Sequence, residues 1–125
     1  MSSMIAERSR RTAHSQASRN SVPDIAAYVQ SVLGPSLTTV TLGIRDVKAV
    51  GQWAKGLRQP RPAQEHLLRE IFQVVNYLAA VEKNDVIRAW FAGMNPDLDD
   101  RSPALTMRDD PQAVIKAADA FVHTG

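Results

Sequence analysis

Five polar residues in one short central segment have the side chains that proteins use to contact nucleic acid: Arg45, Lys48, Gln52, Lys55 and Arg58. Lysine and arginine pair with phosphates or with guanine, and glutamine can pair with both hydrogen-bonding atoms on the edge of adenine. We therefore predict that Lys48 and Gln52 face DNA and that the other three residues contact phosphates. The same side chains would also suit the solvated face of an ordinary helix, so both interpretations stay open here.

The elements that must position these side chains lie between residues 37 and 62, LTTVTLGIRDVKAVGQWAKGLRQPRP, which have the spacing of a helix-turn-helix. Gly43 stands where a first short helix must turn sharply, because glycine takes the left-handed backbone of such a turn without a side-chain penalty. Residues 38–41 of that first helix are all β-branched and locally favour a strand. The helicity of this segment therefore depends on its neighbours.

The second helix of this motif is expected to be about two and a half turns long, capped by Asp46 and ended by Gly56. Pro60 and Pro62 prevent it from continuing. Apolar residues at helical spacing predict a buried face made of Val47, Val50 and Ala54, bordered by Trp53. The predicted outward face consists of Lys48, Ala49, Gln52 and Lys55.

Length and composition restrict the class of protein. A chain of 125 residues can form one domain of ordinary size with a tail. The absence of cysteine excludes a disulfide framework and thiolate metal sites. No apolar run approaches the roughly 20 residues of a membrane span, and the N-terminus lacks the apolar core of an export signal. We expect a soluble, cytoplasmic protein without a membrane partner.

Charge is distributed unevenly along the chain, although the net charge is only +2. Residues 1–21 have four arginines and one glutamate, whereas residues 91–125 have three basic residues and six aspartates. The two ends therefore suit different partners. We predict that residues 1–21 form a disordered basic arm, which either follows a DNA backbone or is a simple extension.

The remaining periodic segments predict further helices, over residues 23–33, 63–81, 85–93 and 111–122. The segment 63–81 is apolar over more than half of its circumference, so it is expected to form the spine of the core and is a candidate for a dimer contact. We predict an all-α fold in which a helix-turn-helix bundle for DNA binding and dimerisation, residues 22–82, precedes a small helical domain, residues 83–125.

Catalytic and metal-binding patterns are not found in the sequence. Asn95, Asp97 and Asp99 begin like a calcium loop, but Asp100 stands where the loop requires glycine, and Thr106 stands where it requires glutamate. The histidines lack metal-ligand spacing, and no phosphate-binding glycine loop or nucleophile elbow occurs. We expect no enzymatic activity and no cofactor.

Two sequence patterns together are typical of one protein family. The first is LGIRDVKAVGQWAKG followed by PRP. The second consists of Trp90, Asn95-Pro96, Leu98, Ser102-Pro103, Leu105, Val114 and Phe121. From about Pro23 onward, the chain resembles the Xre/MbcA/ParS antitoxins. Family members often have glycine before the Ser/Thr-Pro pair, where this chain has Asp99, Asp100 and Arg101.

The resemblance implies a bacterial type II antitoxin with an Xre-like helix-turn-helix and a C-terminal toxin-binding domain. Its partner would be a RES-domain toxin, an enzyme that degrades NAD, and the antitoxin would cover the entrance to the active site. It would also bind operator DNA and repress its own operon, as a homodimer within a toxin-antitoxin hetero-oligomer. The residues expected to bind the toxin are Asn95, Pro96, Leu98, Pro103, Phe121, Val122, His123, Thr124 and Gly125.

Residues 121–125 are the strongest candidates for this contact, because they leave an apolar pair and a small tip with no chain behind them to pack against. Packing on the core is the alternative for the apolar residues of the C-terminal pattern, and for Trp90 it is the favoured interpretation. Two other functions stay open, a stand-alone helix-turn-helix repressor without a toxin partner and a helical adaptor that binds neither DNA nor toxin.

Overall fold

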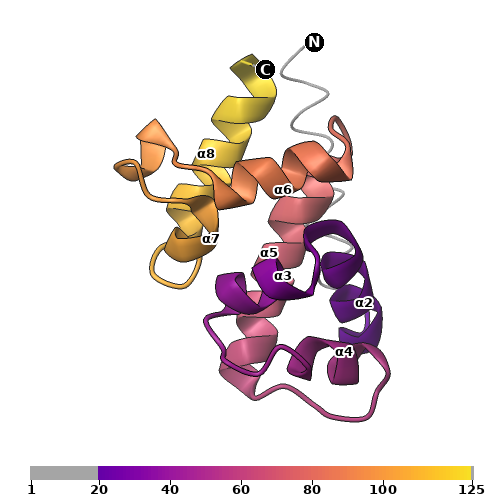
Figure 1. Cartoon of the computed structure of the whole chain (residues 1–125). Helices are drawn as coiled ribbons and strands as arrows, with labels where there is room; N and C mark the ends of the chain where they lie inside the picture. Colours follow the sequence, from indigo (N-terminus) through magenta and orange to yellow (C-terminus); the bar gives the residue numbers. More distant parts are fainter. Residues whose placement is uncertain (1–19, 125) are drawn as a thin grey trace.

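The computed structural model describes residues 20–124, and every regular element in this range is a helix (Figure 1). The elements are α2 (Val22–Leu33), α3 (Pro35–Leu42), α4 (Ala49–Ala54), α5 (Pro62–Ala79), α6 (Asn84–Ala92), the 3₁₀ helix η1 (Pro96–Leu98), α7 (Pro103–Thr106) and α8 (Pro111–Thr124). The predicted all-α fold is confirmed for this part of the chain. The basic arm predicted for residues 1–21 lies almost wholly outside the described residues, as does Gly125.

Helix α5 extends from the level of α3 and α4 up to α6 (Figure 1), and α2, α3, α6 and α8 pack against it. At its start, the Arg61 N–H donates to Gln64 Oε1 at 2.9 Å, which satisfies a donor that has no partner within the helix. Its buried side chains cover more than one face: Leu68, Ile71, Phe72, Val74, Val75, Tyr77 and Leu78. The predicted role of this helix as the spine of the core is confirmed.

Helix α3 forms in spite of its β-branched residues, and its threonine hydroxyls bond to the preceding turn. The Oγ1 atoms of Thr38, Thr39 and Thr41 each donate to the carbonyl oxygen four residues earlier, at 2.7 Å. These bonds satisfy the hydroxyls of three buried residues, which would otherwise be costly to remove from water. The local preference for a strand is therefore overridden by packing, and these hydrogen bonds remove the cost of burying the hydroxyls.

Gly43 ends α3 in the left-handed conformation that the sequence predicts, with φ at 69°. Glycine is needed at position 43 for a second reason. A Cβ atom at residue 43 would overlap the side chain of Arg108, which follows α7 in the chain. The glycine therefore allows the turn and also leaves room for a side chain from the C-terminal part of the molecule.

Helix α4 is shorter than predicted and presents different residues to the core. It has six residues, Ala49–Ala54, and is preceded by a turn at Val47 and Lys48. Ala49 is only 2% exposed, whereas Val47 is 46% exposed. The predictions that Ala49 points outward and Val47 inward are wrong, because the helical period begins after this turn. Val50 and Trp53 are buried as predicted.

Different hydrogen bonds fix the two ends of α4. Asp46 Oδ1 accepts a hydrogen bond from the Lys48 N–H at 2.9 Å, so Asp46 stabilises the preceding turn and is not the N-cap; Lys48 occupies that position. At the other end, Gly56 has φ at 70°. Its N–H donates to the Trp53 carbonyl at 3.1 Å, and the Leu57 N–H donates to the Gln52 carbonyl at 2.9 Å. This is a Schellman arrangement, and the predicted stop at Gly56 is confirmed.

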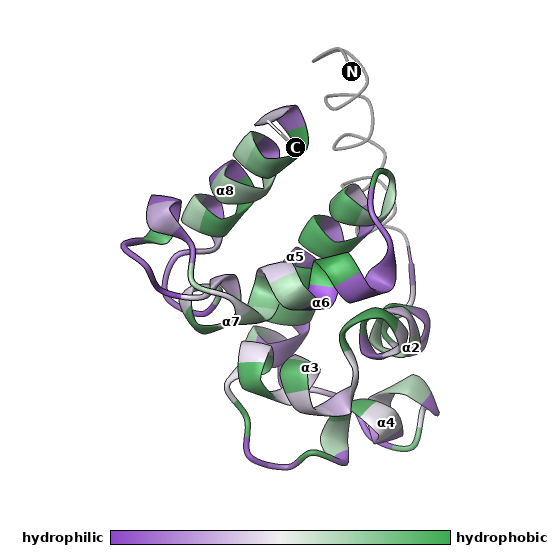
Figure 2. Cartoon of the chain, turned by 45° about the horizontal axis from the view of Figure 1, so that its top comes forward, coloured by the Kyte–Doolittle hydropathy of each residue, from purple (hydrophilic) through white to green (hydrophobic). Residues whose placement is uncertain are grey.

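The C-terminal helices pack directly on the N-terminal ones: α6 on α2, α7 on α3, and α8 on α5. Figure 2 shows hydrophobic and hydrophilic residues alternating along the turns of α6 and α8, as expected for helices with one face on a core. Arg88 of α6 donates from Nε to the Val32 carbonyl at 2.6 Å, at the end of α2 where carbonyls lack partners within the helix. Buried residues on both sides of residue 82 belong to one core.

Within residues 20–124, no single helix has both the length and the apolar character needed to cross a membrane. Helices α2 and α3 reach that apolar content only as a pair, bent by 114° where they join. Both contribute buried residues to the core of the molecule.

Trp53→Ala should lower the free energy of unfolding by about 3–5 kcal/mol, because the side chain is 1% exposed and its removal leaves a large cavity. Thermal and urea unfolding followed by circular dichroism would measure the loss. Trp53→Phe should cost less, since the indole Nε1 makes no hydrogen bond to the described residues. Leu57→Ala is the control, because that side chain is 76% exposed. Equal unfolding curves for Trp53→Ala and the wild type would contradict the burial of Trp53.

Candidate functional site

The five residues predicted to contact DNA are gathered on α4 and on the turns at its two ends. We call them the α4 surface: Arg45, Lys48, Gln52, Lys55 and Arg58. Gln52 is half-buried and the other four are exposed. Helix α4 lies at the opposite end of the molecule from the C-terminus (Figure 1). The described structure therefore brings these predicted side chains together.

A chain of polar contacts joins three residues at this surface. Arg58 Nη1 donates to Asp46 Oδ2 at 3.1 Å, which is also an ion pair, and to Gln52 Oε1 at 3.4 Å. The Arg58 and Asp46 side chains are 52% and 53% exposed, so water screens their attraction and the pair adds little to stability. Its main effect is geometric, since it holds a cationic side chain from beyond α4 against residues before and within α4.

The pKa of Asp46 is held below its ordinary value. The largest cause is the hydrogen bond from the Lys48 N–H to the carboxylate, followed among the lowering effects by the hydrogen bond and charge of Arg58. Both interactions favour the ionised form. Asp46 therefore carries its negative charge at neutral pH, in the middle of a surface whose other charged side chains are basic.

Most of the residues predicted to bind a toxin between α6 and α8 have structural tasks. Asn95 is half-buried, and its Oδ1 accepts the Asp97 N–H at 2.9 Å, which starts η1. Leu98 is 6% exposed, and Pro103 is buried at the start of α7. Pro96 is exposed. The accessible surface offered by this group consequently comes from Pro96 and part of Asn95.

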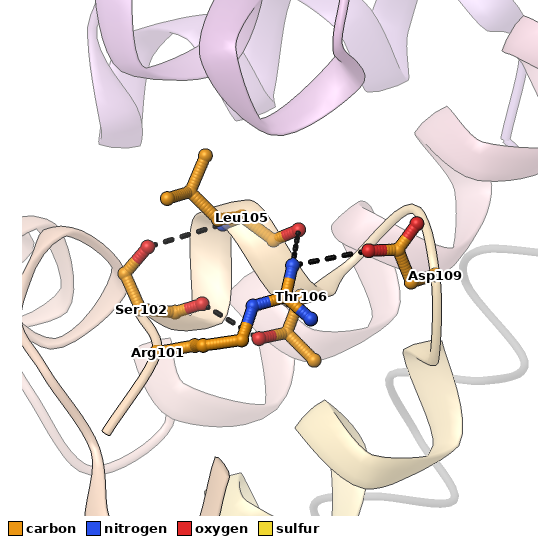
Figure 3. A network of polar contacts seen from close by, with 5 residues as sticks. All are labelled: Arg101, Ser102, Leu105, Thr106 and Asp109. Atoms are coloured by element: carbon orange, nitrogen blue, oxygen red, sulfur yellow. Dashed lines mark hydrogen bonds and ion pairs between the residues drawn. The ribbon is translucent and has the colours of Figure 1, made fainter. Parts of the chain in front are cut away.

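The loop from η1 to α8 is held by a compact network of polar contacts (Figure 3). Arg101 Nη2 donates to the Leu105 carbonyl at 3.2 Å and to Asp109 Oδ2 at 3.0 Å. Ser102 Oγ accepts the Leu105 N–H at 3.1 Å and so caps α7. Asp99 and Asp100 both have positive φ, 56° and 62°, a conformation that aspartate tolerates better than most residues. Two aspartates thus make the left-handed turn before the Ser102-Pro103 pair.

The end of α8 is packed, contrary to the expectation that Phe121 and Val122 have nothing behind them. Both side chains are half-buried against the core, and the rings of Phe121 and Trp90 have their centroids 6.1 Å apart. That expectation is wrong because α6 passes beside α8 and supplies the missing apolar partner. His123 and Thr124 are exposed, and the His123 Nδ1 lies 2.7 Å from the Asp119 carbonyl oxygen.

A shallow depression of about 320 Å³ lies between η1 and α8, and it was not predicted. Its floor is formed by alanines of α8, and one acidic and one basic residue stand beside them. The lining residues are Asp97, Ala113, Lys116, Ala117 and Ala120. The small residues at helical spacing were the only sequence signal for it.

Among residues 20–124, no group of three or more His, Asp or Glu side chains is placed to hold a metal ion. No protein-family model, curated protein or solved structure matches this chain. The pairing of Asp46 with Arg58 was missed by the sequence analysis, which used the two residues for separate purposes. A helix of only six residues, followed by a tight glycine stop, is what lets a residue after α4 reach a residue before it.

The Asp46 carboxyl should titrate below the ordinary value for aspartate, and Arg58→Ala should raise its pKa without restoring that value fully, because the Lys48 N–H remains. NMR titration of the carboxyl carbon would measure this. Since folding lowers this pKa, the contribution of Asp46 to stability is present above the pKa of the unfolded chain and is lost as pH falls through the folded pKa. Lys55→Ala is the control and should leave the titration unchanged. A titration at or above the ordinary value would contradict the two contacts.

Proposed function

We propose that the chain is a DNA-binding antitoxin, in which α3 and α4 form an Xre-like helix-turn-helix and the segment from α6 to α8 binds a RES-domain toxin. The observation that carries the DNA-binding part is the α4 surface, where four cationic side chains and a glutamine stand on one short helix and its flanking turns. The toxin-binding part is supported by the family resemblance and by the acidic composition of residues 91–125.

The composition of the α4 surface supports binding in a major groove. Arg45, Lys48 and Lys55 are exposed cations that can neutralise phosphates, and such contacts supply most of the affinity of DNA-binding proteins. Gln52 supplies both a hydrogen-bond donor and a hydrogen-bond acceptor, and a side chain that reads base edges can use both. The apolar side of α4 is buried at Ala49, Val50 and Trp53, so one side of the helix is held on the core and the other side is polar.

A homodimer would present two α4 surfaces to two half-sites of one operator. In helix-turn-helix proteins of this kind, the half-sites lie about one turn of DNA, or ~34 Å, apart. We therefore infer a palindromic operator close to the promoter of the chain's own operon. This arrangement would let the antitoxin repress its own synthesis.

Gln52→Ala should relax the base preference at one position in each half-site by about 1–3 kcal/mol. Lys55→Ala should instead weaken binding to all sequences alike and reduce the slope of log affinity against log salt by about 1. Fluorescence anisotropy with the DNA upstream of the gene would measure both effects. Lys83→Ala is the matched control, because Lys83 is an exposed lysine just before α6. If the full-length chain does not bind this DNA, with or without a toxin, the assignment of the α4 surface fails.

Of the residues predicted to bind the toxin, the accessible ones lie at two places, the loop around Pro96 and the end of α8 at His123 and Thr124. We propose that these places, together with the depression between η1 and α8, contact the toxin near the entrance of its active site. The six aspartates of residues 91–125 suit a basic surface on the partner. Covering the entrance would prevent NAD from reaching the catalytic groups.

Removing residues 123–125 should weaken inhibition of the RES-domain toxin while leaving the melting temperature nearly unchanged, because Phe121 and Val122 keep their places on the core. The measurement is NAD consumption by a RES-domain enzyme encoded beside this chain, at increasing antitoxin concentration. His66→Ala is the control, since that side chain is 79% exposed on α5. Equal inhibition by the truncated and full-length chains would show that residues 123–125 take no part in inhibiting the toxin. No inhibition by the full-length chain would favour a stand-alone repressor.

A further inference from the structure

We propose that Arg108, a residue of the C-terminal segment, contacts a DNA phosphate beside the α4 surface. This inference rests on the proposed DNA-binding function and adds to it a residue from outside the helix-turn-helix. The observation that carries it is the position of the Arg108 side chain over Gly43, at the turn that leads from α3 into α4.

The first step concerns how Arg108 reaches this turn. Helix α7 packs on α3, and the two helices lie side by side in Figure 1. Arg108 comes two residues after the end of α7. A Cβ atom at residue 43 would collide with Cδ, Nε and Nη1 of Arg108, so the end of the arginine side chain lies directly on the glycine. Both residues are exposed, which places the guanidinium at the surface of the turn.

The second step relates Arg108 to the predicted phosphate contacts. Arg45, an exposed cation of the α4 surface, comes two residues after Gly43. Because each residue spans at most about 3.6 Å, the Cα atoms of residues 43 and 45 lie within about 7 Å of each other. Phosphates follow one another along a DNA strand every ~3.4 Å of the helix axis. Two cations at this separation can therefore each neutralise a phosphate of the same strand.

The third step concerns the charge of Arg108, which has no partner among residues 20–124. Its guanidinium makes no hydrogen bond or ion pair with another described residue. The two aspartates that follow it are directed elsewhere: Asp109 Oδ2 accepts from Arg101 Nη2 at 3.0 Å, and Asp110 Oδ1 accepts the Ala113 N–H at 3.1 Å. The five N–H donors of the guanidinium remain for an external anion. A phosphate matches their planar geometry.

Arg108→Met removes this charge and keeps an unbranched apolar chain over Gly43. It should reduce the slope of log affinity against log salt by about 1, as expected for the loss of one phosphate contact. Affinity for a duplex of mixed sequence should fall roughly 10-fold near 0.1 M salt, and the difference should shrink as the salt concentration rises. Arg108→Lys keeps the charge and should retain the slope of the wild type.

The measurement is fluorescence anisotropy of a labelled, mixed-sequence duplex titrated with the full-length chain, at several salt concentrations between about 50 and 200 mM. Lys116→Met is the matched control, because Lys116 is an exposed cation of the C-terminal segment on α8, which packs on α5, α7 and η1. This variant should keep both the affinity and the salt slope. Melting curves of each variant would establish that it is folded.

Gly43→Asn tests whether the glycine places Arg108. Asparagine tolerates the left-handed backbone at this position, but its side chain would push away the flexible end of Arg108. Arg108→Met should consequently change the salt slope less in the Gly43→Asn background than in the wild type, because residues in contact do not act additively. Equal changes in the two backgrounds would contradict the role assigned to Gly43.

The failure of this inference can be told apart from the failure of the proposed function. If the wild type binds the duplex and Arg108→Met has the same salt slope, the inference is overturned and DNA binding stands. A lower melting temperature with that unchanged slope would show that Arg108 only covers the turn. If the wild type shows no salt-dependent binding to any duplex, the proposed DNA-binding function and the inference fall together.

Discussion

The burial of α4 against α2 is the contact on which the candidate DNA-binding surface depends. A segment of six residues is far shorter than an isolated helix needs to be stable in water, so α4 requires its buried residues, Ala49, Val50 and Trp53. Helix α2 is itself packed on α5, and Arg88 of α6 bonds to its last turn. The geometry of the α4 surface is therefore set by a core that extends into the C-terminal helices.

The C-terminal segment contains the same helix-capping arrangement three times. A polar side chain caps a helix that begins with proline, at Asn95-Pro96, Ser102-Pro103 and Asp110-Pro111. The oxygen satisfies a free backbone donor, and proline loses nothing at a position whose N–H has no partner in the helix. Short helices thereby form between the turns of this segment, while α8 packs on α5 and its Phe121 meets Trp90 of α6.

Local signals in the sequence were enough to predict the longer helices, because caps, glycines and apolar spacing act over a few residues, whereas the short helices η1 and α7 were not predicted. The left-handed turn at Gly43 and the stop at Gly56 are of this kind. The wrong predictions concern places where a short turn shifts the register of a helix, or where residues far apart in the sequence come into contact. A turn at Val47 and Lys48 shifts the helical period of α4, which exchanges Ala49 and Val47 between core and solvent. Contacts between distant residues, such as Asp46 with Arg58 and Phe121 with Trp90, leave no trace in local spacing.

The two left-handed glycines around α4 differ in how much sequence variation they can absorb. No described residue other than the chain neighbours lies within 4 Å of a Cβ atom at Gly56, so asparagine or aspartate, which accept this backbone conformation, would fit among the described residues. At Gly43 the same residues would satisfy the backbone but displace the Arg108 side chain. The turn inside the candidate helix-turn-helix is thus constrained by a residue more than sixty positions later in the chain, and a change at either position alters the space available to the other.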